Sequence, residues 1–269
     1  MSGFRTSALA SLLALAVIPL GVSAQSTAPS QPEAAAPAVG TNDSALRRID
    51  PTDFRSRLDI RDEYQAVESG GYRNVFVLRG DWAVTPTFQL RADVPFVSQE
   101  LKQAGLVGSG IGNILLRANW RALRGASYAV VVAAEVAFPT ITAGLGLERP
   151  VFAPVVFASI DVEEIKSVFF PVYQYFTSVG GDGCCEIRVS SIKPVLFTRW
   201  PNRVYTVVEP NFLVDHVNHN DSGMTLELEV GRLLNPNLAV YLRPGYGVSG
   251  DLPQVYYWNF EVGVRYYFN

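Results

Sequence analysis

The last sixteen residues of the chain, QVYYWNFEVGVRYYFN, alternate between two kinds of side chain. One set is apolar or aromatic and consists of Tyr256, Trp258, Phe260, Val262, Val264, Tyr266 and Phe268. The set between them includes Asn259, Glu261 and Arg265. Since successive side chains of a β-strand point to opposite faces, this stretch predicts a long strand with one aromatic and one charged face.

The same period of two recurs through the chain and predicts an all-β fold of about twelve strands. The segment 151–178 is apolar on both faces and contains prolines, so ten or fourteen strands would also fit. The predicted strands span 55–64, 73–84, 87–99, 112–123, 128–139, 151–161, 167–178, 187–200, 203–217, 223–234, 238–248 and 254–268.

The joins between these strands alternate in length. Short turns such as Thr85-Pro86 and Pro201-Asn202 are followed by longer, often glycine-rich joins such as ELKQAGLVGSGI and NHNDSG. Short turns on one rim and longer loops on the other are typical of bacterial outer-membrane barrels. The sequence therefore predicts a transmembrane antiparallel up-and-down β-barrel with both chain ends at the periplasmic rim.

The charged positions indicate which face of the strands points inward. A soluble barrel would turn its apolar face inward, but here ionisable residues recur at mid-strand, where a lipid-facing charge would cost about 2–4 kcal/mol. We therefore expect these residues to line a wet lumen: Arg79, Arg91, Arg117, Glu135, Glu209, Glu227, Arg243 and Glu261.

The four tryptophans lie near predicted strand ends. Trp82, Trp120 and Trp200 each come just before a short turn, and Trp258 is near the opposite rim. Indole side chains concentrate at membrane interfaces, so these residues are predicted to form an aromatic girdle.

The N-terminus reads as an export signal. Arg5 precedes the apolar run ALASLLALAVIPLGV, and small residues before Gln25 fit a cleavage site, although an uncleaved membrane anchor is an alternative. We expect a signal peptide at 1–24, a disordered periplasmic lead-in at 25–52 and an outer-membrane barrel at 53–269. Lipids and the outer-membrane assembly machinery are the expected partners, because the last strand resembles the assembly signal, with Phe268 penultimate.

Composition argues against several other classes. A net charge of −3 gives no reason to expect nucleic acid. No P-loop lysine follows the glycines near 108–112, and no cofactor or metal site is expected. His216, His219 and Asp221 lack a closed set of four ligands. Adjacent Cys184 and Cys185 are interpreted as loop residues, with or without a bridge to each other.

Three stretches, ADVPFVSQ, GSGIGNILLRANW and EVAFPTITAGLGLE, resemble a group of exported Gram-negative proteins described as meta-pathway phenol-degradation-like or outer-membrane transporters. That family has Gly-x-Gly-Asp before a strand and Pro-Thr-Gly after the next; this chain has Asn113 and Ile141 in place of the Asp and the final Gly. The resemblance covers roughly residues 92–148 and implies a barrel that passes small, often hydrophobic, compounds.

Three functions remain open at this stage. The preferred hypothesis is a channel or transporter for small molecules, hydrophobic ones among them, with an unknown solute. A structural or plugged barrel without transport is the second. The third is an outer-membrane hydrolase using His219 and Ser222, although their spacing of three is the wrong parity for one strand face. We expect no enzyme activity on the sequence alone.

Overall fold

The computed structural model describes residues 46–67, 70–101, 105–139, 145–180, 186–250, 252 and 254–268. These residues form a closed antiparallel β-barrel of twelve strands, as the sequence predicted. The strand segments are β1 (Arg57–Ala66), β2 (Gly71–Thr85), β3 (Phe88–Leu101), β4 (Leu106–Ile111), β5 (Ile114–Arg124), β6 (Tyr128–Phe138), β7 (Val151–Val162), β8 (Ser167–Ser178), β9 (Arg188–Arg199), β10 (Val204–Asp215), β11 (Asp221–Asn235), β12 (Leu238–Ser249) and β13 (Trp258–Tyr267).

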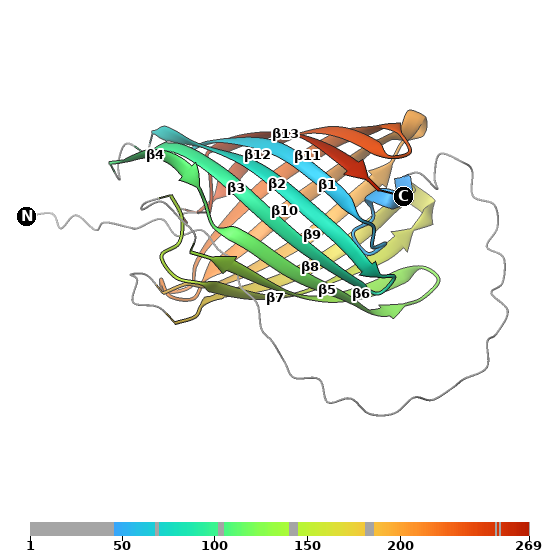
Figure 1. Cartoon of the computed structure of the whole chain (residues 1–269), viewed down its shortest axis with the longest axis horizontal. Coiled ribbons are helices and arrows are strands. Elements are labelled where there is room, and N and C mark those ends of the chain that lie inside the picture. The colour runs from blue at the N-terminus through green and yellow to red at the C-terminus, as the bar shows by residue number, and fades with distance from the viewer. Residues whose placement is uncertain are drawn as a thin grey trace, which may run out of the picture.

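Neighbouring strands pair in chain order, and one further pairing closes the ring. The last strand pairs with the first, with Asp59 opposite Arg265. The strands run obliquely around a cylinder, and the C-terminus lies at the end with short turns (Figure 1). We call this the short-turn end and the opposite end the long-loop end. Closure gives every strand two partners, which strands need if they are to survive in lipid.

One barrel strand is built from two segments. Residues 106–111 of β4 pair with the long-loop half of β3, and β5 pairs with the other half. The strand is interrupted between the two segments at Gly112 and Asn113. A Cβ on Gly112 would come within 2.9 Å of the Val97 side chain. The prediction of a loop through 100–111 was wrong here, because alternate glycines and serine hide the period of two.

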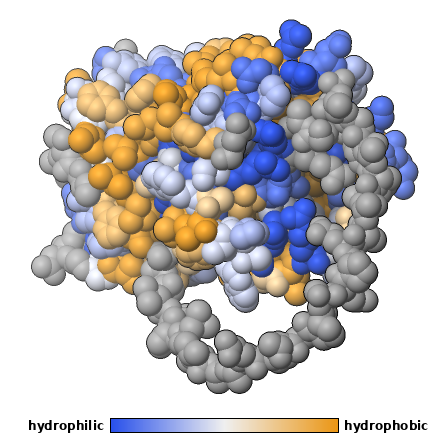
Figure 2. Space-filling model, turned by 45° about the vertical axis from the view of Figure 1, so that its right-hand side comes forward, coloured by the Kyte–Doolittle hydropathy of each residue, from blue (hydrophilic) through white to orange (hydrophobic). Residues whose placement is uncertain are grey.

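The outer face of the wall is apolar. On β13, Phe260, Val262 and Val264 point outward with about two fifths of their surface exposed, while Glu261 and Arg265 are buried inside. Apolar side chains cover much of the wall visible in Figure 2. An outer surface this apolar, wrapped around buried charges, suits a barrel surrounded by lipid.

Tyr256 does not follow the pattern predicted for the C-terminal strand. The strand begins at Trp258, and Tyr256 is buried in the lumen, where its hydroxyl donates to Glu227 Oε1 at 2.7 Å. The expectation that Tyr256 faces lipid was therefore wrong. The residue lies before the strand starts, and a lumen carboxylate accepts the hydrogen bond of its phenol.

All four tryptophans are exposed on the outer surface, with exposed fractions between 41% and 56%. Trp82 and Trp120 lie near the short-turn ends of β2 and β5. Trp200 begins the turn η4 (Pro201–Arg203) and donates from Nε1 to Thr206 Oγ1 at 2.9 Å. Trp258 starts β13 at the long-loop end. Their positions are compatible with two interfacial levels about one strand length apart.

The part of the chain just before the barrel packs into its short-turn end. A short helical turn, η1 (Arg47–Ile49), leads into residues 50–56, and Leu46, Ile49 and Phe54 are buried. The predicted disordered lead-in thus includes residues 46–52 that pack against the wall. The predicted signal peptide, residues 25–45 and the two cysteines lie outside the described residues. None of the helices in the described part is long and apolar enough to cross a membrane.

Candidate functional site

The lumen contains a cavity of about 440 Å³. Its lining comes from inward positions of most of the barrel strands, with Ile49 and Pro51 contributed by the segment before β1. The cavity-lining residues of the described chain include no serine, cysteine or histidine. The described lining of this cavity therefore holds no nucleophile paired with a histidine base.

Arg265 is the centre of one buried ion network. Its Nε donates to Asp59 Oδ2 at 2.8 Å, and its Nη1 donates to Glu229 Oε1 at 2.6 Å. Its guanidinium also lies 4.0 Å from the centre of the Tyr241 ring. Both carboxylates are almost fully buried, so each needs a basic partner, and Arg265 is one that they share.

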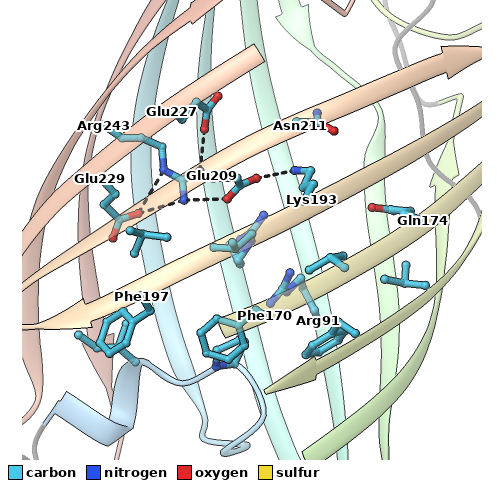
Figure 3. Close-up of a pocket in the computed structure, with 18 of the residues that line it drawn as sticks. Arg91, Phe170, Gln174, Lys193, Phe197, Glu209, Asn211, Glu227, Glu229 and Arg243 are labelled. Atoms are coloured by element: carbon cyan, nitrogen blue, oxygen red, sulfur yellow. Dashed lines mark hydrogen bonds and ion pairs between the residues drawn. The ribbon is translucent and has the colours of Figure 1, made fainter. Parts of the chain in front are cut away.

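Arg243 is the centre of a second network, which joins β9 to β12 and shares Glu229 with the first. Arg243 contacts Glu227 at 3.1 Å, Glu229 at 3.0 Å and Glu209 at 3.7 Å. Lys193 Nζ donates to Glu209 Oε1 at 2.6 Å. Figure 3 shows these charges gathered on one side of the cavity. Because each basic group is held by carboxylates, this part of the wall is a fixed array of charges rather than freely moving side chains.

A third group lies on β1, β2, β3, β5 and β6. Asp81 sits between Arg57 at 2.5 Å and Arg91 at 2.7 Å. Arg91 stands directly opposite Arg117, which pairs with Glu135 in turn. Like charges directly opposite each other in a sheet are unfavourable, so the two arginines need these acids beside them.

Cationic groups outnumber acidic groups on the cavity surface. Eight basic side chains and five acidic side chains line it, while Asp59, Asp81, Asp93 and Glu135 are buried without lining it. A solute in the cavity therefore meets guanidinium and ammonium groups more often than carboxylates. We call the inward charges of β10–β13 and β1–β5 the charged wall.

Apolar side chains gather on one part of the lumen surface. Its side chains come from β7, β8 and β9, and we call them the apolar wall: Val155, Phe157, Phe170, Val172, Val195 and Phe197. Figure 3 shows Phe170 and Phe197 apart from the carboxylates. Inward Val131 and Ala133 on β6 extend this surface below the cavity lining. The lumen thus offers a solute an apolar side and a charged side at once.

The short-turn end of the lumen is narrowed by the segment before β1. Thr52 Oγ1 lies 3.0 Å from Ser159 Oγ, and Arg121 Nη1 donates to the Thr52 carbonyl at 2.9 Å. Arg48 Nη1 reaches Asn237 Oδ1 at 3.1 Å. These contacts attach the segment to three separate strands or turns, so it forms the floor of the cavity.

The long-loop end is narrowed by inward-folded loops. Leu147 and Leu252 are buried with Phe176 and Ile187 in one apolar cluster. Asn113 holds the loop after β6, because its Oδ1 accepts from Leu147 N at 2.9 Å. The Asn of the glycine-rich motif therefore has a structural role at the break between β4 and β5.

The eight residues predicted to line the lumen all point inward. Seven line the cavity, and Glu135 is buried beside Arg117 and Gln174. Sequence reasoning omitted Asp59, Asp81 and Arg265 from its list, although their inward parity was a usable signal. The apolar wall was missed because β7 and β8 carry apolar residues on both faces, and nothing in the period distinguishes lumen from lipid there.

His219 and Ser222, which the sequence suggested as a hydrolase pair, are arranged differently from expectation. His219 lies in the turn before β11 with a left-handed backbone (φ 55°), while Ser222 faces outward in β11 opposite Val214. The histidine that contacts a serine is His216, whose Nε2 forms a hydrogen bond with Ser190 Oγ. Within the described residues, no group of three His, Cys, Asp or Glu side chains is placed to hold a metal ion.

Comparison with known proteins gives matches at the level of structure only. No family model and no curated protein sequence matches this chain. An outer membrane channel from Pseudomonas putida F1 is similar with a TM-score of 0.61 and 14% identity, over 80% of this chain and 96% of that one. The NanC porin gives 0.59 and 12% (78% and 98% covered), and the KdgM porin 0.54 and 11% (79% and 99% covered).

These similarities, together with the closed ring and the charged lumen, define the class. The chain has the fold of outer-membrane channel and porin barrels with twelve strands. At such identities the comparison extends to the fold alone, so the solute must be inferred from this lumen's own surface.

Proposed function

We propose that this protein is an outer-membrane conduit for small amphipathic molecules, namely acids with an aromatic or aliphatic body. The observation that carries the proposal is the two-sided lumen, because arginines such as Arg91 and the residues of the apolar wall line the same cavity. The apolar wall would bind the body of the solute, and the guanidinium groups exposed on the cavity surface would bind its carboxylate.

The geometry also sets the scale of the solute. The cavity of about 440 Å³ falls within the usual range of small-molecule sites, about 300–1,000 Å³. A twelve-strand barrel lies between filled eight-strand barrels and wide sixteen-strand porins. We infer that solutes the size of a single aromatic ring with a short substituent would pass best, ahead of sugars of equal mass.

Flux into proteoliposomes tests this function. Vesicles with the folded protein should take up benzoate faster than glucose, and faster than benzylamine, which has the same ring with a cationic group. Phe170→Ser should reduce the preference for benzoate over glucose, and Arg91→Gln should reduce the preference for benzoate over benzylamine. Folded protein that supports neither solute flux nor ion conductance would refute the conduit.

A second candidate, a barrel held closed, is favoured by the contacts of the floor segment. Ile49 and Pro51 line the cavity, and Thr52 is tied to the wall through Ser159. Removing residues 46–54 would then raise conductance from near zero, while the unchanged protein stayed closed. If the full chain conducts and the deletion adds little, the closed-barrel candidate fails.

A further inference from the structure

The long-loop end of the barrel carries a cluster of polar side chains on its outer surface. Ser190 Oγ lies 2.8 Å from His216 Nε2. The other ring nitrogen, His216 Nδ1, lies 3.0 Å from Asn220 Oδ1. Serine, histidine and a third group that orients the histidine are the parts of a nucleophile activated by a base.

Strand register explains why these residues meet. Ser190 of β9 stands opposite Val214 of β10, so His216, two residues further along, is its diagonal neighbour on the outer face. The backbone N–H of His216 donates to the Arg188 carbonyl at 2.7 Å, which extends the pairing to this position. Strand pairing therefore holds Ser190 and His216 next to each other.

The turn after β10 supplies the third group. Asp215 Oδ1 accepts from Val217 N at 2.9 Å, and its Oδ2 accepts from Asn218 Nδ2 at 2.7 Å. Asn220 follows with a left-handed backbone, φ 63°, a conformation that asparagine tolerates better than most residues. The Asn220 side chain is thereby directed back to the histidine ring.

The hydrogen-bond pattern is consistent with one tautomer of His216. With the proton on Nδ1, the ring donates to Asn220 Oδ1 and leaves Nε2 free to accept from the Ser190 hydroxyl. In that state Nε2 can take the proton of Ser190 when its oxygen attacks an electrophile. An additional donor is close by, because the Tyr173 hydroxyl lies 3.3 Å from Ser190 Oγ and can turn toward a developing oxyanion.

The height of the cluster points to the chemistry of its substrate. Ser190 lies on β9 and Trp200 directly follows it, ten positions further along, which corresponds to about 33 Å of extended chain. With a tilt of about 40°, the vertical separation is about 25 Å, the height of the apolar band of such barrels. If Trp200 marks one interface, Ser190 lies at the other, where acyl-ester carbonyls of lipids meet water.

We propose that Ser190, His216 and Asn220 form an ester hydrolase site for acylated lipids on the outer face of the barrel. Ser190 Oγ bonds to the ester carbonyl carbon as its proton passes to His216 Nε2, and Tyr173 donates to the resulting oxyanion. The carbon–oxygen bond to the lipid alcohol then breaks, and His216 returns the proton to the leaving alcohol. Water next attacks the acyl-serine, gives a proton to His216, and releases the fatty acid as Ser190 regains its hydrogen.

The mature protein refolded in bilayers tests this site. Two ester sources separate the substrates: phosphatidylethanolamine vesicles and vesicles containing lipid A. We expect fatty-acid release from at least one of them, and a fluorophosphonate adduct on Ser190 detected by mass spectrometry. Ser190→Ala should abolish both signals, and His216→Ala should lower the rate about 100-fold or more.

Asn220 is a positioning residue and needs its own readout. Asn220→Ala should slow hydrolysis about 10-fold by lowering kcat with little effect on KM, and Asn220→Asp should restore most of the rate, because its carboxylate can accept from Nδ1. His219→Ala and Ser222→Ala are matched controls at the same rim and should leave the rate unchanged.

Several outcomes would overturn the site. Folding of each variant is first verified by its heat-modifiable shift on gels. Hydrolysis retained in folded Ser190→Ala, or a fluorophosphonate adduct on Ser222 in place of Ser190, contradicts the assignment. Activity on soluble short esters alone contradicts a lipid substrate, and the absence of both hydrolysis and adduct refutes the hydrolase. Flux through the lumen is measured separately and is expected to survive every one of these substitutions.

Discussion

The charged wall and the apolar wall are parts of the same barrel but are held in place in different ways. Arg265 and Arg243 sit between buried carboxylates, so each side chain has fixed partners. Phe157 and Phe170 of the apolar wall pack without any such partner. Removing one charge leaves its partners uncompensated, whereas removing an apolar group enlarges a space that already exists. Substitutions in the charged wall should therefore lower the free energy of unfolding more than substitutions in the apolar wall.

The largest effect is expected where one arginine serves two buried acids. Arg265→Leu leaves Asp59 and Glu229 without their shared partner, and we expect a loss of about 3–5 kcal/mol in the free energy of unfolding. Urea unfolding from lipid bilayers measures it. Arg188→Leu breaks an exposed pair with Glu186, and its effect on the free energy of unfolding should be far smaller. Equal losses in the two variants would contradict the special role of the charged wall.

The matching change on the apolar wall should cost less. Phe157→Ala removes a buried ring that packs near Val131 and Val155. We expect about 3 kcal/mol, the low end for such truncations, because water from the adjoining lumen can fill the new space. The same unfolding experiment applies, with outward Phe260→Ala as the comparison. A loss well above that of Arg265→Leu would reverse the proposed order of the two walls.

The ion pair of Lys193 and Glu209 lies at the boundary between the two walls. It tests whether a loss of stability comes from the missing partner or from the charge left behind. Glu209→Gln leaves Lys193 without its carboxylate and should cost about 1–3 kcal/mol. Adding Lys193→Met removes the stranded charge, so the double variant should recover more than half of that loss. A double-mutant cycle on unfolding free energies gives the coupling energy of the two residues. Strictly additive losses would show that the pair is not coupled.

The smallest effect is expected outside both walls, at the aromatic girdle. Trp200→Phe keeps the ring character but loses the hydrogen bond to Thr206, which should cost about 0.5–1 kcal/mol. Thr206→Val should cost a similar amount, and the double variant little more than either. If Trp200→Phe approached the loss in Phe157→Ala, the outer surface would have to contribute more to stability than its exposure suggests.

The two walls also differ in how far the sequence predicts them. On β2, β3 and β11 through β13, polar and apolar residues alternate, so the strand, its inward face and its charges can all be predicted from the period. On β7 and β8 both lipid and lumen meet apolar side chains, so the alternation disappears. The strand limits were still predicted well, because turns flank them, but the apolar lumen surface was not.

Features that depend on contacts far apart in the sequence were also beyond prediction. Tyr256 continues the alternation of the last strand, yet a carboxylate on β11 draws it inward. Leu46 and Ile49 stand in a stretch rich in Ala and Pro, and only the barrel end gives them something to pack against. The bond between Ser190 and His216 joins residues on different strands, so only the strand register reveals it.

The central claim is that the apolar face of every strand meets lipid while the charges meet an internal lumen. The four native tryptophans are all on the outer face, so their fluorescence in bilayers of bromine-labelled lipid tests that claim directly. We predict strong quenching by the lipid bromines and weak quenching by acrylamide in water. A Phe170→Trp variant stripped of the native tryptophans should show the weaker lipid quenching of a lumen residue. Native tryptophans untouched by the bromines, with Trp fluorescence quenched from water, would contradict the account.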